Sequence, residues 1–307
     1  MKKILITGWS GFLGLNLTRL LLDSGYQVIG FSRNDPVPHL GIINHPAFLF
    51  IRGNLVNNAH LETIPEIDCM VHLAGNVSAN YSIKNCREDF ENNVIATFNI
   101  LEYCRKRSNV TLIYASTAKI YPLADLVKHT PYGTSKYVAD CYAQEYILTY
   151  NIPIIINRFV TFYGPRQYNF SEPDRSWINW FIEANITGKP IVLAGQGDQI
   201  RDPLFIGDAA ELVKIQIENP AMVGNIYDVG AGTDNSITPS QVVEQIVQLS
   251  GKRFVEIKKR ERRHDEKKEF VADISKISTF WKPKHKFSKG LSITYKWLDS
   301  TLMKNSE

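Results

Sequence analysis

The sequence of 307 residues lacks a long hydrophobic run and is poor in cysteine. No stretch approaches the roughly 18 consecutive apolar residues that a membrane-spanning helix needs, so we predict no membrane partner. The apolar run after Lys3 stops after three residues at a glycine-rich turn, which indicates a strand and not a signal peptide. The four cysteines are widely spaced, without a C-x-x-C pair or a nearby histidine at metal-ligand spacing. We therefore expect no metal site and a reduced, cytoplasmic setting.

The chain also lacks a strong excess of charge of one sign. Its 35 Lys and Arg residues nearly balance 31 Asp and Glu residues, which leaves a net charge of +4. The basic cluster Lys258–Lys268 includes three acids and no interleaved aromatic residues, so it is typical of a solvated surface segment. We predict no nucleic-acid partner, whereas an anionic small molecule is compatible with this balance.

The first half of the sequence alternates short apolar runs with longer periodic segments. This alternation predicts an α/β fold, a Rossmann-type doubly wound parallel sheet. The expected strands are Lys3–Thr7, Gln27–Phe31, Phe48–Arg52, Cys69–Leu73, Thr111–Ala115 and Pro153–Asn157, and the expected crossover helices are Phe12–Ser24, Asn85–Arg107 and Gly133–Tyr150.

After about residue 160 the sequence pattern changes, because prolines divide the chain into short elements. We expect a Rossmann domain over residues 1–160 and a smaller, discontinuous C-terminal α/β domain over residues 161–307. The run Asn225–Gly230 resembles another buried strand, so parts of residues 203–230 are expected to complete the first sheet.

A glycine-rich turn follows the first expected strand and opens the first expected helix. Glycine allows a tight turn and lets the backbone approach a pyrophosphate, whose charge then faces the helix N-terminus. The turn has the spacing GxxGxxG, and the alternative is an ordinary turn that ends a strand. Its predicted cofactor-binding residues are Gly8, Ser10, Gly11, Phe12, Leu13 and Gly14.

The ends of the second and third strands predict the adenosine side of such a site. Ser32 and Arg33 stand where an acid would bind a ribose 2′-hydroxyl, and an arginine pairs with a 2′-phosphate. This slightly favours NADP over NAD, and the alternative for Arg33 is an exposed loop arginine. Asn54, followed by Leu55, either hydrogen-bonds an adenine edge or caps the next short helix.

Tyr132 and Lys136 lie four residues apart at the start of an expected helix, so their side chains share one face. A nearby ammonium favours the phenolate form of a tyrosine, which then accepts a proton from an alcohol. Ser116 and Thr117 end a buried strand upstream, and either one orients the reacting oxygen or caps the following turn.

Together these motifs, in this order, resemble the extended short-chain dehydrogenase/reductases of the NAD-dependent epimerase/dehydratase family. The resemblance runs over nearly the full length. It also includes Val71–Gly75, Asn93–Thr97, Arg158, Tyr163–Gln167 and Arg201–Asp202. Three later segments most resemble the CDP-paratose 2-epimerase branch of this family: Gly164–Gln167, Asp174–Phe181 and Phe270–Ile274.

The resemblance implies an enzyme with a nicotinamide cofactor, NAD or NADP, and a nucleotide-diphosphate sugar as substrate. Tyr132 would be the catalytic base, Lys136 would lower its pKa and hold the nicotinamide ribose, and Ser116 or Thr117 would orient the substrate. The resemblance adds Leu73, Ala74, Gly75 and the structural Asn93 to the cofactor site. The first domain would then bind NAD(P), and the second would bind the substrate.

Substrate contacts are predicted in the second half. Thr161 takes the place of a family Asn that contacts the substrate, and Arg166 follows the family's Gly-Pro pair. Trp177, on one helix face with Trp180, either stacks on a base or sugar or anchors the core. Arg201 and Arg262 have the chemistry to pair with diphosphate oxygens, and the alternative for Arg262 is a surface pair with Glu266.

The dehydratases of this family carry an Asp-Glu pair after the strand-end Thr, whereas this chain has Ala118-Lys119. We therefore predict an epimerase that oxidises a sugar carbon transiently and returns hydride to the opposite face. An NADPH-dependent 4-ketoreductase is the alternative, and a catalytically silent nucleotide-binding subunit is a third hypothesis. The segment Tyr121–Tyr132 is shorter than in the family, and Pro122 replaces a Gly, which predicts a sugar pocket unlike that of a UDP-galactose 4-epimerase. Family members dimerise through the helices expected at Asn85–Arg107 and Gly133–Tyr150, so a homodimer is expected.

Overall fold

The computed structural model of the chain describes residues 2–36, 41–107, 109–120, 130–168, 176–262 and 268–304. The chain divides into two compact units. Unit 1 comprises Met1–Phe159 with Ala209–Tyr227, and unit 2 comprises Val160–Asp208 with Asp228–Glu307.

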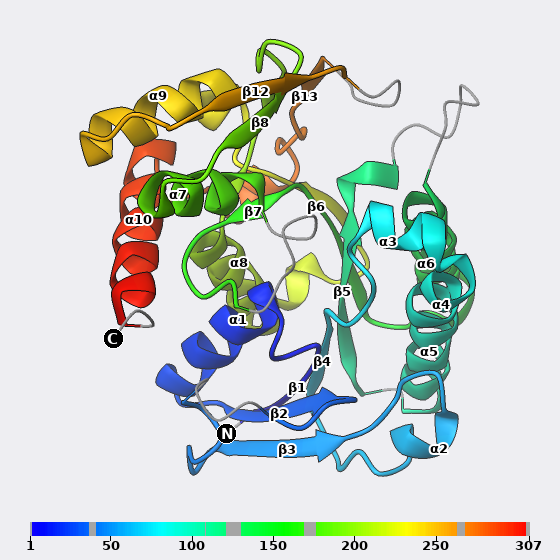
Figure 1. Cartoon of the computed structure of the whole chain (residues 1–307). Helices are drawn as coiled ribbons and strands as arrows, with labels where there is room; N and C mark the ends of the chain where they lie inside the picture. Colours follow the sequence, from blue (N-terminus) through cyan, green and yellow to red (C-terminus); the bar gives the residue numbers. More distant parts are fainter. Residues whose placement is uncertain are drawn as a thin grey trace. The chain divides into compact units, whose positions relative to one another are not determined.

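Unit 1 is built on a seven-stranded sheet (Figure 1). Its strands are β1 (Lys3–Thr7), β2 (Gln27–Ser32), β3 (Phe48–Arg52), β4 (Cys69–His72), β5 (Thr111–Thr117), β6 (Ile154–Phe159) and β11 (Ile226–Val229). They lie in the order β11-β6-β5-β4-β1-β2-β3, and the pairs from β3 to β6 are parallel. From β1 the strand order runs to β2 and β3 on one side, and from β4 it runs to β5 and β6 on the other side. The point between β1 and β4 where the order changes direction is where ligands bind in such sheets. The predicted Rossmann-type sheet is confirmed.

The helices of unit 1 cover its sheet. They are α1 (Phe12–Asp23), α2 (Asn58–Leu61), α3 (Ala79–Lys84), α4 (Cys86–Phe90), α5 (Ala96–Lys106), α6 (Pro131–Tyr150) and most of α8 (Ile206–Glu218), with 3₁₀ turns at Ala118–Ile120 and Pro220–Met222. The segment expected as one helix, Asn85–Arg107, is helical from Cys86 to Lys106, with a π-helical turn at Glu91–Ile95 between α4 and α5. Helix α6 begins two residues before the predicted Gly133, because Thr130 accepts a hydrogen bond from the Gly133 amide and Pro131 occupies the first turn.

The core of unit 1 lies between the sheet and these helices. Fully buried residues such as Leu5, Met70, Ile100, Leu112 and Ile154 form one hydrophobic cluster. The strand residues among them are buried because helices such as α5, which carries Ile100, cover the sheet, as its parallel arrangement requires. The rigid sheet gives the carboxyl ends of β1, β4 and β5 fixed positions.

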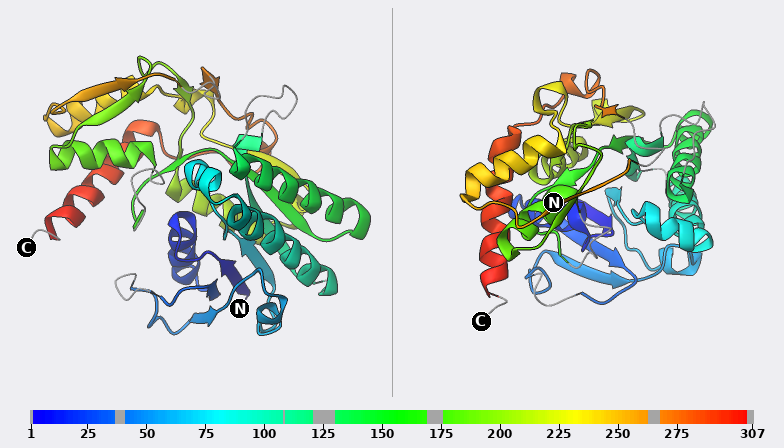
Figure 2. Two further views of the ribbon diagram at one scale, coloured as in Figure 1. Left: turned by 45° about the vertical axis from the view of Figure 1, so that its right-hand side comes forward. Right: turned by 45° about the horizontal axis from the view of Figure 1, so that its top comes forward.

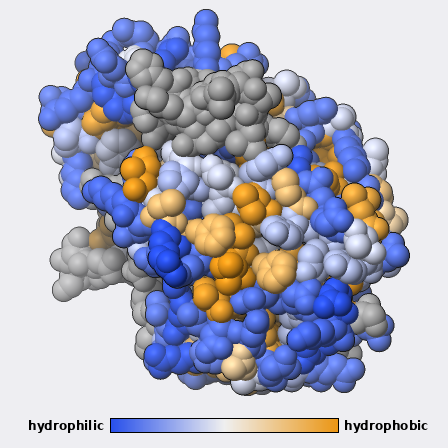
Figure 3. Space-filling view, turned by 90° about the vertical axis from the view of Figure 1, so that its right-hand side faces the viewer, coloured by the Kyte–Doolittle hydropathy of each residue, from blue (hydrophilic) through white to orange (hydrophobic). Residues whose placement is uncertain are grey.

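The outer faces of α5 and α6 carry exposed hydrophobic side chains. They include Phe98, Tyr137, Tyr142, Leu148 and Tyr150, and Leu148 is 76% exposed. Figure 3 shows hydrophobic residues gathered among polar ones on the side of the molecule where Figure 1 places α4, α5 and α6. Helices α5 and α6 pack against each other, so these side chains lie on adjoining helix faces.

Unit 2 combines three short parallel strand pairs with three packed helices (Figure 2). The pairs are β7 (Phe162–Tyr163) with β10 (Leu204–Phe205), β8 (Ile191–Ala194) with β12 (Ile257–Arg260), and β9 (Ile200–Arg201) with β13 (Glu269–Phe270). The helices are α7 (Trp177–Thr187), α9 (Pro239–Ser250) and α10 (Phe287–Lys304), and 3₁₀ turns lie at Thr233–Asn235 and Ile277–Thr279. Their core includes Ile182, Ile191, Val242, Ile246 and Leu291. Within the described parts of both units, no helix has the length and apolar character needed to cross a membrane.

Candidate functional site

The turn between β1 and α1 requires glycine at its ends. Gly8 has a positive φ of 69°, and a Cβ there would lie 2.8 Å from the Ala74 backbone nitrogen. A Cβ on Gly14 would lie 2.2 Å from the Gly8 carbonyl oxygen. Gly11 is the N-cap of α1 and offers no side-chain hydrogen bond. The first-turn amides of α1 are therefore not capped by that residue, and a helix N-terminus of this kind favours an anion.

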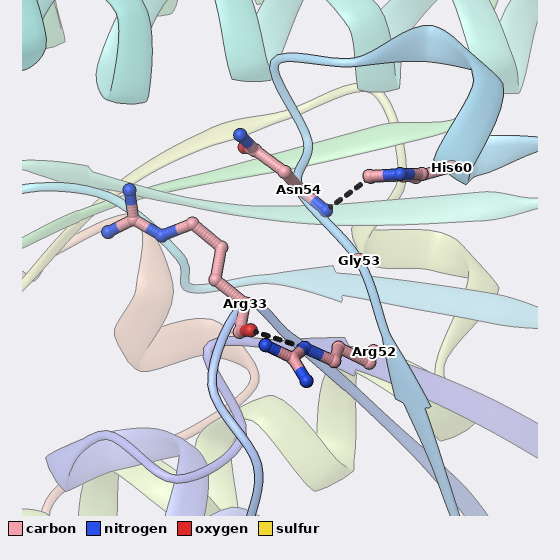
Figure 4. A pocket seen from close by; sticks show the side chains of 5 residues that line it. All are labelled: Arg33, Arg52, Gly53, Asn54 and His60. Carbon is pink, nitrogen blue, oxygen red and sulfur yellow. Dashed lines mark hydrogen bonds between the residues drawn. The ribbon is translucent and has the colours of Figure 1, made fainter.

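A pocket of about 330 Å³ lies at the ends of β2 and β3, lined by Arg33, Arg52, Gly53, Asn54 and His60 (Figure 4). The Asn54 amide donates to His60 Nδ1 at 2.9 Å, and in Figure 4 the Asn54 carboxamide points away from the imidazole. The Arg52 Nε donates to the Arg33 carbonyl at 3.2 Å. The pocket has two guanidinium groups and one carboxamide in its lining; Arg52 pairs with Asp35 at 3.2 Å, and Asn54 Oδ1 accepts the Val56 amide at 3.1 Å. Guanidinium groups beside a carboxamide suit an anion next to a base edge.

The contacts around this pocket bear on the alternatives for Asn54 and Arg33. Asn54 does not cap α2, because the Asn57 side chain accepts the Ala59 amide at 3.1 Å and fills that role. Arg33 is exposed, and its guanidinium donates to Asn92 Oδ1 at 3.2 Å. Ser32 donates its hydroxyl to the Asn34 carbonyl at 2.8 Å, which shapes the loop. The buried Leu55 uses its carbonyl to accept the Asn99 side chain at 2.8 Å.

The structure brings Thr117 and Tyr132 together. Thr117 ends β5, and Tyr132 lies in the first turn of α6. Burial raises the pKa of Tyr132, the neighbouring Thr117 hydroxyl lowers it, and the negative charge of Asp89 raises it further. A phenolate at neutral pH therefore needs a positive charge beside Tyr132.

Ser116 points to a different set of partners. Its hydroxyl donates to Asp140 Oδ2 at 2.6 Å. Asp140 is fully buried and also accepts the Arg158 guanidinium at 2.7 Å. Successive side chains of a strand alternate between its faces, so Ser116 and Thr117 cannot do the same work. Of the two candidates for orienting a reacting oxygen, the geometry favours Thr117.

Lys136 lies almost buried at the end of β5. Its ammonium donates to the Ala115 carbonyl at 2.6 Å and lies 4.4 Å from the centroid of the Tyr114 ring. Burial lowers the pKa of Lys136 to about 8, although the carboxylates of Asp140 and Asp89 oppose that change. The two carboxylates thus help Lys136 to keep its positive charge near neutral pH.

Asn93 lies in the π-helical turn and holds the loop after β4. Its Oδ1 accepts the Asn76 amide at 2.8 Å, and a Cβ on Gly75 would lie 2.6 Å from the same atom. Its Nδ2 donates to Ser135 Oγ at 3.0 Å. Asn93 therefore connects the loop that contains Leu73, Ala74 and Gly75 with the first turn of α6.

Two buried polar residues were missed by the sequence analysis. Asp89 accepts hydrogen bonds from Asn76, Asn93 and Ser135, and the only available signal was its position four residues before Asn93. His72, at the end of β4, bonds through Nδ1 to Thr7 Oγ1 at 2.8 Å and through Nε2 to Thr97 Oγ1 at 3.0 Å.

The hydrogen-bond directions around His72 form one continuous chain. The Ala74 amide donates to Thr7 Oγ1 at 3.2 Å, which leaves the Thr7 hydroxyl proton for His72 Nδ1. The Thr97 hydroxyl donates to the Asn93 carbonyl at 2.6 Å, so it accepts from Nε2. Burial lowers the pKa of His72 to about 3, and a neutral imidazole with its proton on Nε2 fits these directions. The glycine turn and the Asn93 turn are thereby joined.

In unit 2 the segment Gly164–Gln167 adopts an unusual backbone. Arg166 has a positive φ of 67°, which is uncommon outside glycine and often marks a functional site. The buried Asn179 of α7 holds this segment, since its Nδ2 donates to the Gly164 carbonyl at 2.7 Å and its Oδ1 accepts the Gly164 amide at 3.2 Å. Thr161 lies exposed just before β7, and its carbonyl accepts the Leu204 amide at 2.9 Å.

The other predicted substrate residues lie on separate elements of unit 2. Trp177 and Trp180 both pack on the hydrophobic cluster, and the Trp177 ring lies 5.5 Å from that of Phe181. Arg201, in β9, donates from its guanidinium to the Ile200 carbonyl at 2.7 Å.

Arg262 forms an ion pair with Asp198. The expected partner Glu266 and the segment with Tyr121 and Pro122 lie outside the described residues.

Comparison with known proteins agrees with this arrangement. The chain matches the NAD dependent epimerase/dehydratase family over residues 4–230. A CDP-paratose 2-epimerase of Salmonella typhi is 31% identical, over 97% of this chain and 99% of that protein. The crystal structure of a dTDP-glucose 4,6-dehydratase of Bacillus anthracis with NAD has a TM-score of 0.84 and 28% identity, covering 98% of this chain and 97% of that one.

A UDP-glucose 4-epimerase of Thermus thermophilus, also solved with NAD, has a TM-score of 0.82 and 25% identity, covering 96% of this chain and 98% of that one. The resemblance predicted from the sequence motifs is confirmed. The chain belongs to the NAD dependent epimerase/dehydratase family.

Proposed function

We propose that this protein is a nucleotide-diphosphate-sugar epimerase that oxidises one sugar carbon transiently and then reduces it from the opposite face. The observation that carries the proposal is the placement of Tyr132 and Lys136 one turn apart in α6, next to the end of β5 that carries Thr117, with the Lys136 ammonium 2.6 Å from the Ala115 carbonyl of that strand. The similarity to the CDP-paratose 2-epimerase of Salmonella typhi supports the same reaction class.

The residues after Thr117 argue against the dehydratase activity found elsewhere in the family. Ala118 and Lys119 stand where the resemblance places an Asp-Glu pair in dehydratases. The Lys119 ammonium lies 5.5 Å from the centroid of the Tyr132 ring. Loss of water needs a proton acceptor and a proton donor at these positions, and an alanine and an ammonium do not supply that pair.

The residues of unit 1 fit a nicotinamide dinucleotide. Gly8, Gly11 and Gly14 let the backbone form a tight turn at the N-terminus of α1, where Ser10, Phe12 and Leu13 supply the rest of the turn and the helix N-terminus would face a pyrophosphate. Asn54 and Leu55 would hold the adenine end, and the loop Leu73–Gly75 with Asn93 and Lys136 would hold the nicotinamide end. When bound, the cofactor supplies an acceptor and donor of hydride.

The chain's own side chains then handle the proton. Tyr132 accepts the proton of the substrate hydroxyl as the carbon is oxidised and returns it when the carbon is reduced. Thr117 fixes the oxygen by hydrogen bonding, and the charge of Lys136 favours the phenolate form of Tyr132. Ser116 contributes by holding Asp140, which in turn faces Lys136.

The pocket with Arg33 and Arg52 supports NADP over NAD. A 2′-phosphate carries negative charge that a guanidinium pairs with, whereas a ribose 2′-hydroxyl prefers a carboxylate at this place. This preference also supports the second candidate function, a 4-ketoreductase that consumes NADPH.

Unit 2 would bind the nucleotide sugar. Arg201 and Arg262 are the candidate ligands of the diphosphate, Arg166 and Thr161 those of the sugar, and Trp177 lines the site while packing on the core. The observation that supports a ligand-binding role is the strained backbone of Arg166, held by Asn179.

A homodimer formed through α5 and α6 completes the proposal. Exposed aromatic and aliphatic residues on both helices, among them Phe98, Tyr142 and Leu148, would be buried between two copies (Figure 3). Sedimentation of the purified protein tests this, and a monomer at micromolar concentration would contradict it.

Denaturing the purified protein and identifying the released nucleotide by mass spectrometry tests the cofactor. Near-stoichiometric NAD⁺ or NADP⁺ is expected, because an epimerase retains its cofactor through the cycle. An empty site that binds NADPH reversibly would favour the ketoreductase, and failure to bind either nucleotide would overturn the proposed function.

A further inference from the structure

A buried carboxylate that the proposed mechanism does not use lies beside the catalytic pair. Asp89, near the end of α4, is 1% exposed. Its Oδ2 accepts the Ser135 hydroxyl at 2.6 Å, and its Oδ1 accepts the side-chain amides of Asn76 and Asn93. In the described part of the chain no cation pairs with it, so three hydrogen-bond donors compensate its burial.

We propose that Asp89 is a positioning residue that ties the first turn of α6 to the loop after β4, and so holds Tyr132 in place against the cofactor-binding loop. This inference rests on the proposed function of Tyr132 as the proton acceptor.

The first connection runs through Ser135. This residue lies between Tyr132 and Lys136, and its hydroxyl has a single proton to donate. The nearest acceptor is Asp89 Oδ2 at 2.6 Å, and the Tyr132 carbonyl follows at 3.1 Å. Asn93 Nδ2 donates to the same hydroxyl at 3.0 Å, so the Ser135 side chain is held from two sides. Fixing Ser135 fixes the helical turn that carries both Tyr132 and Lys136.

The second connection runs through Asn76. Its side chain donates to Asp89, and its backbone amide donates to Asn93 Oδ1 at 2.8 Å. Gly75 immediately precedes it, at the point where the loop approaches Asn93 most closely. The π-helical turn that carries Asn93 begins two residues after Asp89. Such turns are rare and often found at functional sites, because they re-aim side chains within a helix.

The charge of Asp89 provides a readout that a purely structural contact would not change. Its carboxylate raises the pKa of Tyr132 and of Lys136. The other charged groups near this pair in the described structure are Lys119, whose ammonium lies over the Tyr132 ring, and Asp140, which faces Lys136 and pairs with Arg158. The titratable side chains of Tyr114 and His72 also lie near Lys136. Replacing Asp89 with Asn keeps the shape and two acceptor contacts but removes one negative charge.

The test follows the Tyr132 phenol directly, by a pH titration of the tyrosine Cζ signals in NMR, with Tyr132→Phe to assign the signal. The apparent pKa of Tyr132 is expected to fall in Asp89→Asn, because the charge that opposes the phenolate is gone. Glu88→Gln is the matched control, since it removes one charge from the adjacent exposed residue of α4, and no change is expected there. An unchanged titration in Asp89→Asn would overturn the proposal.

Ser135→Ala tests the contact and keeps the charge. With CDP-paratose as substrate, kcat is expected to fall about tenfold, while KM and the titration of Tyr132 stay as in the wild type. A wild-type kcat in Ser135→Ala would overturn the proposal. If Asp89→Asn does not fold, the kcat of Ser135→Ala decides whether the proposal holds. If the protein turns over no nucleotide sugar, the proposed function fails, and the Tyr132 titration still decides the role of Asp89.

Discussion

The two units differ in how their predicted site residues are held. In unit 1, Asn93, the loop after β4 and the first turn of α6 with Tyr132 belong to one set of buried hydrogen bonds. In unit 2, Arg201 and Arg262 lie on separate segments, and each contacts its own local partner. The carboxyl ends of parallel strands meet at one edge of a sheet, so the fold itself assembles the first group. Loops assemble the second group, which suits a part of the enzyme that selects the substrate.

The largest effect is expected at Tyr132. Tyr132→Phe removes the proton acceptor and should lower kcat by about 10²- to 10⁴-fold, because this is the usual contribution of a general base. Cofactor content, measured by mass spectrometry of the denatured protein, should stay unchanged. A near wild-type kcat in Tyr132→Phe would contradict the assignment of the catalytic residues to unit 1.

The two neighbours at the end of β5 should respond differently. Thr117→Val should lower kcat roughly tenfold or more with little change in thermal stability. Ser116→Ala leaves the buried Asp140 without one donor, so its main effect should be a loss of about 1–3 kcal/mol of unfolding free energy. Steady-state kinetics and chemical denaturation of both variants check this. A larger loss of kcat in Ser116→Ala than in Thr117→Val would reverse the assignment.

His72 predicts a pH dependence of stability confined to unit 1. Its pKa is about 3 in the folded protein and about 6.5 when unfolded, so between these values only the unfolded chain takes up the proton. Stability due to this group is therefore complete above pH 6.5 and is lost as the pH falls, by up to about 1.4 kcal/mol per unit. The difference in unfolding free energy between wild type and His72→Asn should shrink on acidification.

His45→Asn serves as the control, because it leaves the buried chain from Ala74 to Asn93 intact. It should keep the acid sensitivity that His72 contributes. A constant difference between wild type and His72→Asn from pH 4 to pH 7 would show that His72 is not held neutral.

The smallest effects are expected in unit 2. Arg201→Ala should raise KM for the nucleotide sugar with little change in kcat, because binding to a diphosphate is uniform along the reaction. Arg262→Ala should do the same to a lesser extent, since Asp198 competes for its guanidinium. Steady-state kinetics of the two variants separates these values. If Arg201→Ala or Arg262→Ala lost as much kcat as Thr117→Val, the assignment of catalysis to unit 1 and substrate binding to unit 2 would be contradicted.

The sequence predicted unit 1 well, because its signals are local. Glycine is required where Gly8 and Gly14 meet the backbone, and a four-residue spacing places Tyr132 and Lys136 on one face. It did not predict the π-helical turn at Glu91–Ile95 or the role of Asp89, since both depend on partners distant in sequence, such as Ser135.

The choice between Ser116 and Thr117 also lay beyond the sequence. Both residues are small hydroxyl side chains at a strand end, and only the position of the buried Asp140 separates them. In unit 2 the packing of Trp177 on Phe181 and the pairing of Arg262 with Asp198 depend on how loops fold back. Short elements between loops contain too few residues to show a hydrophobic periodicity, so the sequence does not predict these contacts.

Transfer of a labelled hydrogen tests the central claim most directly. The protein, without added nicotinamide, is incubated with CDP-paratose carrying deuterium at C2 and, separately, with UDP-glucose carrying deuterium at C4. An epimerase that retains its cofactor should give the epimer of one of these sugars with the deuterium still on the same carbon. Loss of the label to water, or a strict need for stoichiometric NADPH, would contradict this account.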